Sequence, residues 1–515
     1  MADATLNNQF PELVFGIAGP IGVDIDGIID SLSAALRAVR YAPVAIRLTD
    51  EMKLYRKSRA PANQGFFETS QDRMHLGNEI CERFGDQATL ARIGIQAILS
   101  KRGALSGSHA KPAERTAYIL RQLKRPDEVA LLRKVYGPQF VLVSANGQVA
   151  LRKALLLEQI RQNQAASVTA ASLSRMADEL VGDDASDDKP FGQRLRDTFH
   201  LADVFIDGLN RQAMEEKLSR FIQALYGRAD IGPSKEEFGM YAANSAALRS
   251  NDLSRQVGAV IFSPDGELIS QGCNEAPKAF GGNYWDSEAP DFRDVKIGHD
   301  PNASEIREVL RDLFERLLAS NMLSETAKTL GSPSAIVRAV TTRTRSRSNT
   351  SEIGALANAA VMDLTEYGRV VHAEMNAICD AARTGRAVKG GILFCTTFPC
   401  HNCTKHILAA GIKRVIYIEP YPKSRAKSLH MNEIEVDGEN PSRVVFAPFM
   451  GISPSRYPEI FQKGRRKNSE GRARHWYHED GPRPMVDVTY PAYLELEKLE
   501  LSRLLGSVVS ENNEP

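Results

Sequence analysis

Apolar and polar segments alternate along the first 210 residues and predict strands and helices in turn. Residues 11–19 form an almost continuous apolar run that ends in glycine, which is typical of a buried strand opening into a turn. Apolar residues then recur at helical spacing, at Ile28, Ile29, Leu32, Leu36 and Val39. A second helical pattern starts at Pro126, and the apolar runs 140–143 and 203–206 are typical of strands. This alternation predicts an α/β domain whose sheet is covered by helices.

The pattern after residue 210 predicts a second α/β domain. Residues 211–225 have helical spacing, and two apolar runs, 257–262 and 267–271, flank a Ser-Pro-Asp-Gly turn that favours a hairpin. A helical stretch around 306–318 and an Arg/Ser/Thr segment interrupt this domain. The organisation that we predict has a first domain (1–210), a linker helix (211–234), a second domain (235–450, with an insertion at about 283–368) and a C-terminal tail (451–515).

Composition narrows the class of protein. The chain has 515 residues, of which 43% are hydrophobic, so it is long and apolar enough for about three globular units. Lys and Arg total 65 against 64 Asp and Glu, which argues against a surface that binds nucleic acid throughout but leaves local basic patches open. Residues 182–190 are too polar to pack, so we expect an exposed loop there. The apolar run 13–23 is broken by glycine and proline, and we expect neither a signal peptide nor a membrane span.

The cysteines point to metal chemistry. Six cysteines are too few for a disulfide scaffold in a chain of this length, so we expect a reducing, cytoplasmic setting. His372 and Glu374 precede a helical pattern, and Pro399 precedes Cys400 and Cys403, 28 positions farther on. One imidazole and two thiolates supply three zinc ligands and leave a fourth position for water. Glu374 is then placed to carry a proton between that water and a leaving amino group, a signature known for nucleobase deaminases.

Other interpretations of this motif remain open at this point. Two cysteines separated by two residues also form redox pairs, and the zinc could be purely structural. His401 and His406 could in principle compete as ligands. A purely structural site has no need of the proton-carrying Glu374, which favours the catalytic interpretation.

Three segments of the second domain resemble the deoxycytidylate deaminase branch of the cytidine deaminase superfamily: residues 371–378, 397–403 and 255–260. The resemblance implies a mixed sheet of about five strands between helices, and a zinc ion. Residues 272–277 resemble a turn of that branch whose asparagine contacts the nucleotide sugar. The resemblance implies this role for Asn274, unless the asparagine serves only as a turn residue. A strand ending before Tyr421 and Lys423 would offer an aromatic face to a base and a cation to a phosphate, unless both are ordinary loop residues.

The first domain resembles small P-loop kinases, but with a degenerate phosphate loop. Gly19 and Gly22 keep the glycine frame, whereas Ile25 and Asp26 stand where the lysine and the magnesium-binding hydroxyl would be. We therefore expect this domain to bind a nucleotide or phosphate at Gly19 and Gly22 without kinase turnover. The alternative is a decayed loop that holds no ligand, with the domain serving as a scaffold for oligomer contacts.

The two halves together resemble bacterial anti-phage deoxycytidine nucleotide deaminases. That family implies conversion of dCTP and dCMP to the deoxyuridine forms during infection. The predicted partners are free deoxycytidine nucleotides, a regulatory nucleotide or RNA, and a second copy of the chain, with no membrane. Basic residues between 338 and 347 and between 463 and 474 fit either a solvated loop or a triphosphate or RNA site. The rival functions are a polynucleotide (tRNA or single-stranded DNA) deaminase and a nucleotide-sensing module with structural zinc.

Overall fold

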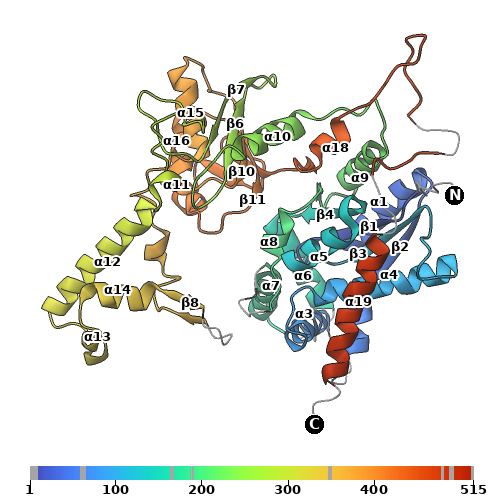
Figure 1. The fold of residues 1–515 in the computed structure, drawn as a ribbon, viewed down its shortest axis with the longest axis horizontal. Coiled ribbons are helices and arrows are strands. Elements are labelled where there is room, and N and C mark those ends of the chain that lie inside the picture. Colours follow the sequence, from blue (N-terminus) through green and yellow to red (C-terminus); the bar gives the residue numbers. More distant parts are fainter. Residues whose placement is uncertain are drawn as a thin grey trace. The chain divides into compact units, whose positions relative to one another are not determined.

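The computed structural model of the chain describes residues 10–57, 65–162, 168–185, 187, 191–345, 351–476, 481–486 and 492–511. The chain folds into two compact units (Figure 1). Unit 1 combines Met1–Tyr241 with Pro448–Pro515, and unit 2 is Ala242–Ala447.

Unit 1 is built on a six-stranded sheet with the order β14-β5-β4-β1-β3-β2. The first five strands in sequence are parallel, and β14 is antiparallel to β5 at one edge. The strands are β1 (Leu13–Ala18), β2 (Ala42–Arg47), β3 (Thr116–Arg121), β4 (Phe140–Asn146), β5 (Val204–Asp207) and β14 (Gly451–Ile452). All six residues of β1 are buried, as the apolar run predicts. The strands expected at 140–143 and 203–206 are confirmed as β4 and β5.

Helices enclose this sheet. They are α1 (Ile25–Ala38), α2 (Leu48–Glu51), α3 (Phe66–Arg83), α4 (Thr89–Ser106), α5 (Pro126–Tyr136), α6 (Val149–Gln162), α7 (Ala170–Ala185), α8 (Leu195–Phe199), α9 (Arg211–Leu225), α18 (Tyr457–Phe461) and α19 (Ala492–Glu511), with short 3-10 turns at Met52–Tyr55 and Gly137–Gln139. The next helix after α9 is α10 (Lys235–Ala247). Helix α10 continues from unit 1 into unit 2.

Helix α9 has the bounds expected from the sequence but not the expected role as a linker. Its residues Met214, Leu218 and Phe221 are fully buried in the core that α1 forms with the sheet. Burying the apolar face of an amphipathic helix in a core stabilises the fold, whereas a helix that crosses solvent between two domains would leave that face exposed. The first unit therefore extends through α9.

The segment expected to be a C-terminal tail returns to unit 1. β14 pairs with β5, and α19 packs on α4, where Arg102 is fully buried and forms ion pairs with Glu497 of α19 and Glu12. These partners are separated by up to 395 residues in sequence, so no local pattern could indicate the pairing.

The polar segment 182–190 is not simply a loop. Helix α7 runs to Ala185, and Asp184 is 1% exposed because its carboxylate pairs with Lys124, 2.5 Å away. Residues 186 and 188–190 of that segment lie outside the described residues, as does Arg347 of the Arg/Ser/Thr segment.

Unit 2 also has a six-stranded sheet, of order β12-β13-β11-β10-β6-β7, one strand more than expected. It is mixed: β10 is antiparallel to β6 and parallel to β11. The strands are β6 (Gly258–Phe262), β7 (Leu268–Cys273), β10 (Ile392–Thr397), β11 (Arg414–Glu419), β12 (Ile434–Val436) and β13 (Val444–Pro448). The hairpin expected from the Ser-Pro-Asp-Gly turn is confirmed as β6 and β7, closed by a hydrogen bond from Gly266 N to Ser263 O.

Helix α15 (Ala373–Arg383) packs on β7, β6 and β10, and α16 (His401–Ala409) packs on α15 (Figure 1). Helix α17 (Ala426–Leu429) contacts α16 and precedes β12. The start of α15 sits directly on β7, since a Cβ on Gly272 would lie only 2.4 Å from the carbonyl oxygen of Ala373. This close approach fixes the residues that begin α15.

The expected insertion is helical, with α11 (Asp294–Ile297), α12 (Pro301–Ala319), α13 (Glu325–Thr329) and α14 (Pro333–Thr341), a hairpin of β8 (Arg343–Arg345) and β9 (Ser351–Ile353), and a 3-10 turn at Ala360–Asp363. Ile306 and Leu310 of α12 pack on Val337 of α14 in a small core of their own. The rest of the insertion returns toward the sheet.

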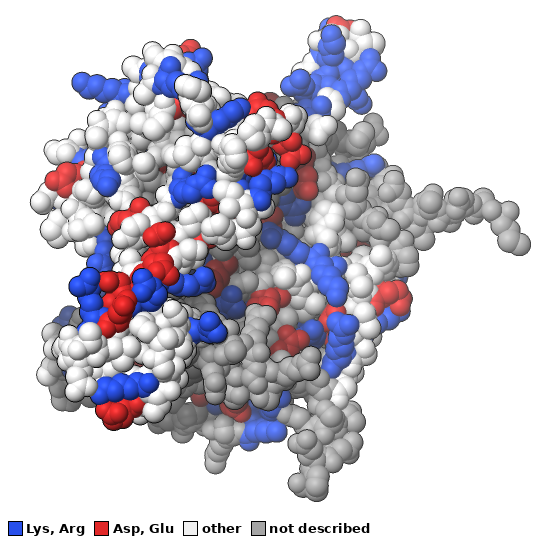
Figure 2. Space-filling view, turned by 60° about the vertical axis from the view of Figure 1, so that its left-hand side comes forward, with Lys and Arg blue, Asp and Glu red and all other residues white. Residues whose placement is uncertain are grey.

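Charges of both signs are interspersed over the face of the molecule shown in Figure 2, as the near-neutral composition predicts. In the part of the chain that the structure describes, no helix combines the length and apolar character that crossing a bilayer demands.

Candidate metal centre and active site

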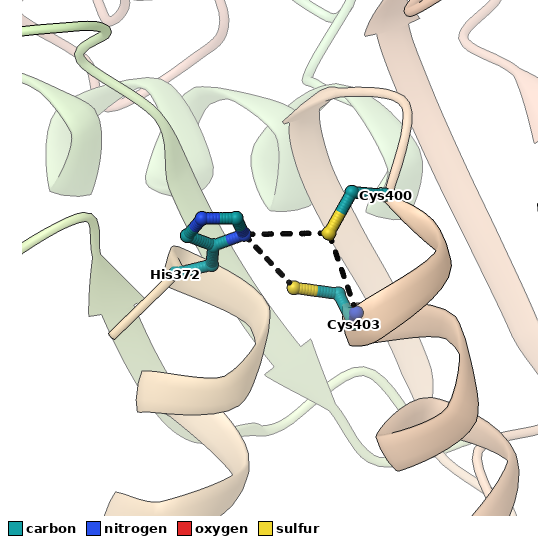
Figure 3. Close-up of side chains that lie close together, drawn as sticks. All are labelled: His372, Cys400 and Cys403. Carbon is teal, nitrogen blue, oxygen red and sulfur yellow. Dashed lines mark hydrogen bonds between the residues drawn. The ribbon is translucent and has the colours of Figure 1, made fainter. Parts of the chain in front are cut away.

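The predicted ligands come together at the starts of two helices. His372 is the N-cap of α15 and Cys400 is the N-cap of α16, with Cys403 in the first turn of α16. The His372 Nδ1 atom lies 3.4 Å from the Sγ atoms of both Cys400 and Cys403, and the imidazole points toward the two thiols (Figure 3). One ligand atom from each residue lies within 4.8 Å of the others. The arrangement could hold a metal ion.

The donor set fits zinc. Zinc in proteins is commonly bound by thiolates and imidazoles in a tetrahedral arrangement, and three protein ligands leave a position for water. Among the described residues, the group of clustered histidine, cysteine and acidic ligands contains neither His401 nor His406. The competing ligand assignments are therefore not favoured by the geometry.

The surroundings of Cys400 favour the thiolate that a metal needs. A hydrogen bond from Cys403 lowers the pKa of the Cys400 thiol to about 4, with further help from His372. The Cys403 N–H also donates to the Cys400 Sγ at 3.4 Å, as a residue at a helix start allows. The hydrogen bond with Cys400 in turn raises the pKa of His372 to about 9, so that metal binding must displace a proton from the imidazole.

Glu374 lies in the first turn of α15, one residue from Ala373 and two from His372. Its side chain is almost completely buried, at 4% exposed, yet it lines the cavity next to the ligands. Burial, together with the nearby Cys400, raises the pKa of this carboxyl group. A carboxyl group with a raised pKa holds a proton more readily than a free one and is suited to accept and release it during a reaction.

A cavity of about 280 Å³ opens beside the ligands. It is lined by His372, Glu374 and Cys400, and by the predicted Asn274 and Tyr421. Lys423 is not part of the lining: it is exposed and its ammonium pairs with Asp363, 2.6 Å away. The structure therefore brings Asn274 and Tyr421 to the site and leaves Lys423 outside it.

Asn274 holds the start of α15 in place. Its Oδ1 accepts a hydrogen bond from Ala373 N at 3.0 Å, and its Nδ2 donates to Asp252 Oδ2 and to Arg255 O, each at 3.2 Å. Both amide hydrogens are thus used within the protein. One lone pair of Oδ1 stays available to a ligand in the cavity.

Several cavity residues were not singled out from the sequence. Arg255 lies in one of the segments that resemble deaminases, and its guanidinium lies over the Tyr421 ring and pairs with Glu419 at 3.0 Å. Arg369, at the end of the insertion, pairs with Asp294 at 2.9 Å. Other lining residues from the insertion are Asp300, Asn302 and Thr365. No local sequence motif identifies these residues as part of the site, because they line the cavity only when the insertion folds back onto it.

The degenerate loop of unit 1 lies where expected, between β1 and α1, but its polar groups are largely taken. Gly19 O accepts hydrogen bonds from Lys124 Nζ and Gln122 Nε2. Ile21 N donates to Asp184 Oδ2 at 2.7 Å. Gly22 has φ +92°, where a side chain would be strained. The glycine frame is therefore present, and protein groups occupy much of the cradle that a phosphate would need.

Comparisons with known proteins agree with the metal centre. The family model described as the cytidine and deoxycytidylate deaminase zinc-binding region matches residues 233–419. The deoxycytidylate deaminase of Enterobacteria phage T4 is 44% identical over 55 residues, which are 11% of this chain and 28% of the phage protein. The human deoxycytidylate deaminase is 46% identical over 54 residues, which are 10% of this chain and 29% of the human protein.

The chain thus spans less than a third of the length of these curated relatives. Among solved structures, the dCMP deaminase of cyanophage S-TIM5 in complex with dCMP and dUMP is similar, with 18% identity, a TM-score of 0.22, and coverage of 42% of this chain and 98% of that chain. On the family match and the ligand geometry, residues 233–419 form a zinc-binding deaminase domain of the cytidine and deoxycytidylate deaminase type.

Proposed function

We propose that the chain is a hydrolase that deaminates free deoxycytidine nucleotides, dCTP and dCMP, to dUTP and dUMP. The observation that carries the proposal is the buried carboxyl group of Glu374 beside the His372, Cys400 and Cys403 ligands, at one cavity. Water adds to the ring carbon that bears the amino group, the carbon–nitrogen bond breaks, and ammonia leaves.

Zinc, when bound by His372, Cys400 and Cys403, lowers the pKa of water and so supplies a nucleophile at neutral pH. Glu374 takes a proton from the attacking water and delivers protons to the pyrimidine and to the departing ammonia. Its burial supports this role, because a carboxyl group with a raised pKa is protonated more readily during the cycle.

The rest of the cavity supports a nucleotide as substrate. Phe398 and Tyr421 provide aromatic faces against which a pyrimidine can pack. The guanidinium groups of Arg255 and Arg369 line the same cavity and are suited to phosphate oxygens. Asn274 offers its remaining lone pair to a sugar hydroxyl.

We further infer, from the resemblance of both halves to anti-phage deaminases, that the activity depletes dCTP during viral infection. The cytoplasm is where such a substrate pool would be met. Measuring nucleotide pools by mass spectrometry in infected cells, with the wild type and the Glu374→Ala variant, tests this role. Equal dCTP pools in the two infected cultures would contradict it.

The reaction itself is tested with purified zinc-loaded protein. Ammonia release and product mass are measured with dCMP, dCTP, CMP, free cytosine and a single-stranded oligonucleotide. We expect turnover of deoxycytidine nucleotides and poor turnover of CMP and cytosine. Deamination of the oligonucleotide alone would identify a polynucleotide deaminase, and zinc without any turnover would identify a nucleotide-sensing module.

A further inference from the structure

Unit 1 contains a second cavity, of about 510 Å³, that plays no part in deamination. It lies at the carboxyl ends of parallel strands, since its lining includes Arg47 at the end of β2 and Arg121 at the end of β3. β2 and β3 lie on one side of β1, and β4 and β5 on the other, so the end of β1 is a topological switch point of the sheet. Ligands of open α/β sheets bind at such points, commonly in cavities of roughly 300–1,000 Å³.

The charge of the lining favours an anion. Five basic side chains and three carboxylates line the cavity: Arg47, Arg73, Arg121, Lys124 and Arg125 against Asp24, Asp26 and Asp184. Of the basic groups, Lys124 is tied to Asp184 and Arg125 to Glu128, both within the protein interior. The cations that stay accessible are therefore the three arginines at the ends of β2 and β3 and on α3.

Arg73 is the freest of these three. It is exposed on α3 and, among the residues that the structure describes, makes no hydrogen bond or ion pair. Arg47 and Arg121 share the single carboxylate of Asp26, which is 68% exposed, with Arg47 at 3.7 Å. The other exposed carboxylate of the lining, Asp24, lies 3.7 Å from Arg211, which is outside the cavity. The three guanidinium groups are therefore not balanced by carboxylates of the lining, and a further anion could accept paired hydrogen bonds from them.

The phosphate loop itself is closed to such an anion by the protein's own carboxylates. Asp184 accepts from Ile21 N at 2.7 Å and from Lys124 Nζ at 2.5 Å, so its carboxylate stands where a bound phosphate would be. Asp24 accepts from Gly27 N at 2.8 Å and thereby caps α1. A chain of phosphates reaching from the arginines into the loop would meet both carboxylates.

The opposite wall of the cavity suits a ring. Met52, Phe66, Met74 and Leu90 provide apolar surface. Gln193, which is 9% exposed, also lines the cavity, and in the described structure its buried Oε1 atom has no hydrogen-bond partner. A buried acceptor left in this way is costly, and a ring amino or imino group in the cavity would satisfy it.

We propose that this cavity binds a nucleoside monophosphate. The phosphate lies on the guanidinium groups of Arg47, Arg73 and Arg121, the base packs against Phe66 and Met74, and a base N–H donates to Gln193 Oε1. The loop around Gly19 and Gly22 shapes the cavity but does not hold the phosphate. This site is separate from the proposed deaminase function and does not depend on it.

The test is calorimetric titration of the full chain with AMP, GMP and dTMP, and with inorganic phosphate, adenosine and ATP as comparison probes. We expect at least one monophosphate to bind, more tightly than phosphate, its nucleoside or its triphosphate. Arg73→Ala should weaken that binding tenfold or more, since a charge-assisted contact is lost. Arg37→Ala, an exposed arginine at the far end of α1, is the matched control and should bind as the wild type does.

Two further variants make the result decisive. Asp184→Asn removes the carboxylate charge from the loop and should raise the affinity for ATP relative to AMP. Arg255→Ala alters the deaminase cavity and should leave AMP binding unchanged. Absence of binding by all three monophosphates, tighter binding of ATP than of AMP by the wild type, unchanged affinity in Arg73→Ala, or loss of binding in Arg255→Ala alone would each overturn the proposal.

Discussion

Replacing Asn274 by alanine separates two roles that this residue could have. In the structure its Oδ1 accepts from the buried Ala373 N–H, and its amide group donates to Asp252 and Arg255. The resemblance to deoxycytidylate deaminases instead implies a contact with the nucleotide sugar. The first role holds the start of α15, between His372 and Glu374, whereas the second affects the substrate alone.

The size of the effect follows from these contacts. Ala373 is fully buried, so its N–H loses its acceptor, at a cost of about 1–3 kcal/mol. The two donated bonds end at more exposed groups, and each contributes about 0.5–1.5 kcal/mol. We therefore expect Asn274→Ala to lower the free energy of unfolding by about 2–6 kcal/mol. A shift of α15 by even 1 Å moves His372 and Glu374 and can reduce kcat about 100-fold.

Three measurements on the same protein preparation distinguish the roles: urea unfolding, zinc content by elemental analysis, and steady-state kinetics with dCMP. The matched control is Gln271→Ala, which removes an exposed amide from the neighbouring strand β7. Asn274→Asp is a second variant, because it keeps the acceptor for Ala373 N but places a carboxylate against Asp252. We expect it to be less stable than the wild type at neutral pH and to recover as one carboxyl group is protonated.

The reasoning would be refuted by a clear pattern. If Asn274→Ala unfolds at the same urea concentration as the wild type, keeps its zinc and its kcat, and differs only in a raised KM, then Asn274 contacts the substrate and does not position α15. A fall in both stability and kcat, with the control unaffected, supports the positioning role.

Three further outcomes are expected. Cys403→Ser should lower the zinc content from about one ion per chain to well below stoichiometry, because one of the two thiolate ligands is lost; full zinc occupancy by elemental analysis would show that another residue completes the site. Glu374→Gln should keep the fold and the zinc but reduce kcat by about 10²- to 10⁴-fold, the usual contribution of acid–base catalysis, and near-normal turnover would exclude it as the proton carrier. Burial alone would raise the pKa of Glu237, but hydrogen bonds from Arg220 and backbone N–H groups lower it below 4.5. The stability that the ionised Glu237 contributes is therefore present above pH 4.5 and is lost as the pH falls through the lowered pKa. In urea unfolding, Glu237→Gln should lose less stability on acidification than the wild type does.

Features encoded within short segments could be predicted from the sequence. Two of these features, the buried strand β1 and the β6–β7 hairpin, depend on residues close together in the sequence. A third, the set of His372, Cys400 and Cys403, depends on residue types and a spacing that are typical of a zinc site. The three ligand positions were predictable because they lie at the starts of two helices, and the residues that follow have helical spacing. The chemistry of the site could therefore be inferred before the fold.

Features that depend on contacts between distant segments could not. The return of the C-terminal segment depends on a two-residue strand, β14, and on the pairing of Arg102 with Glu497. Helix α9 has the same apolar spacing whether it bridges domains or packs in a core, so its role was decided only by its neighbours. Residues 182–185 seemed too polar to pack, because the lysine that pairs with Asp184 lies 60 positions earlier.

The candidate active site also combines residues that short motifs predict with residues that depend on contacts between distant segments. The residues that would act on the reacting atoms, His372, Glu374 and the two cysteines, come from the ends of two helices that are rigidly set on the sheet. Arg369, which lines the same cavity, comes from the end of the insertion and is held by Asp294 of the insertion. Such a wall can change its charge or shape without displacing α15 or the metal ligands. In the proposed function, selection among nucleotides would therefore be structurally separable from the deamination step. The motifs of the sequence carry the metal ligands and Glu374 but not this wall, so they could not decide between dCTP and dCMP.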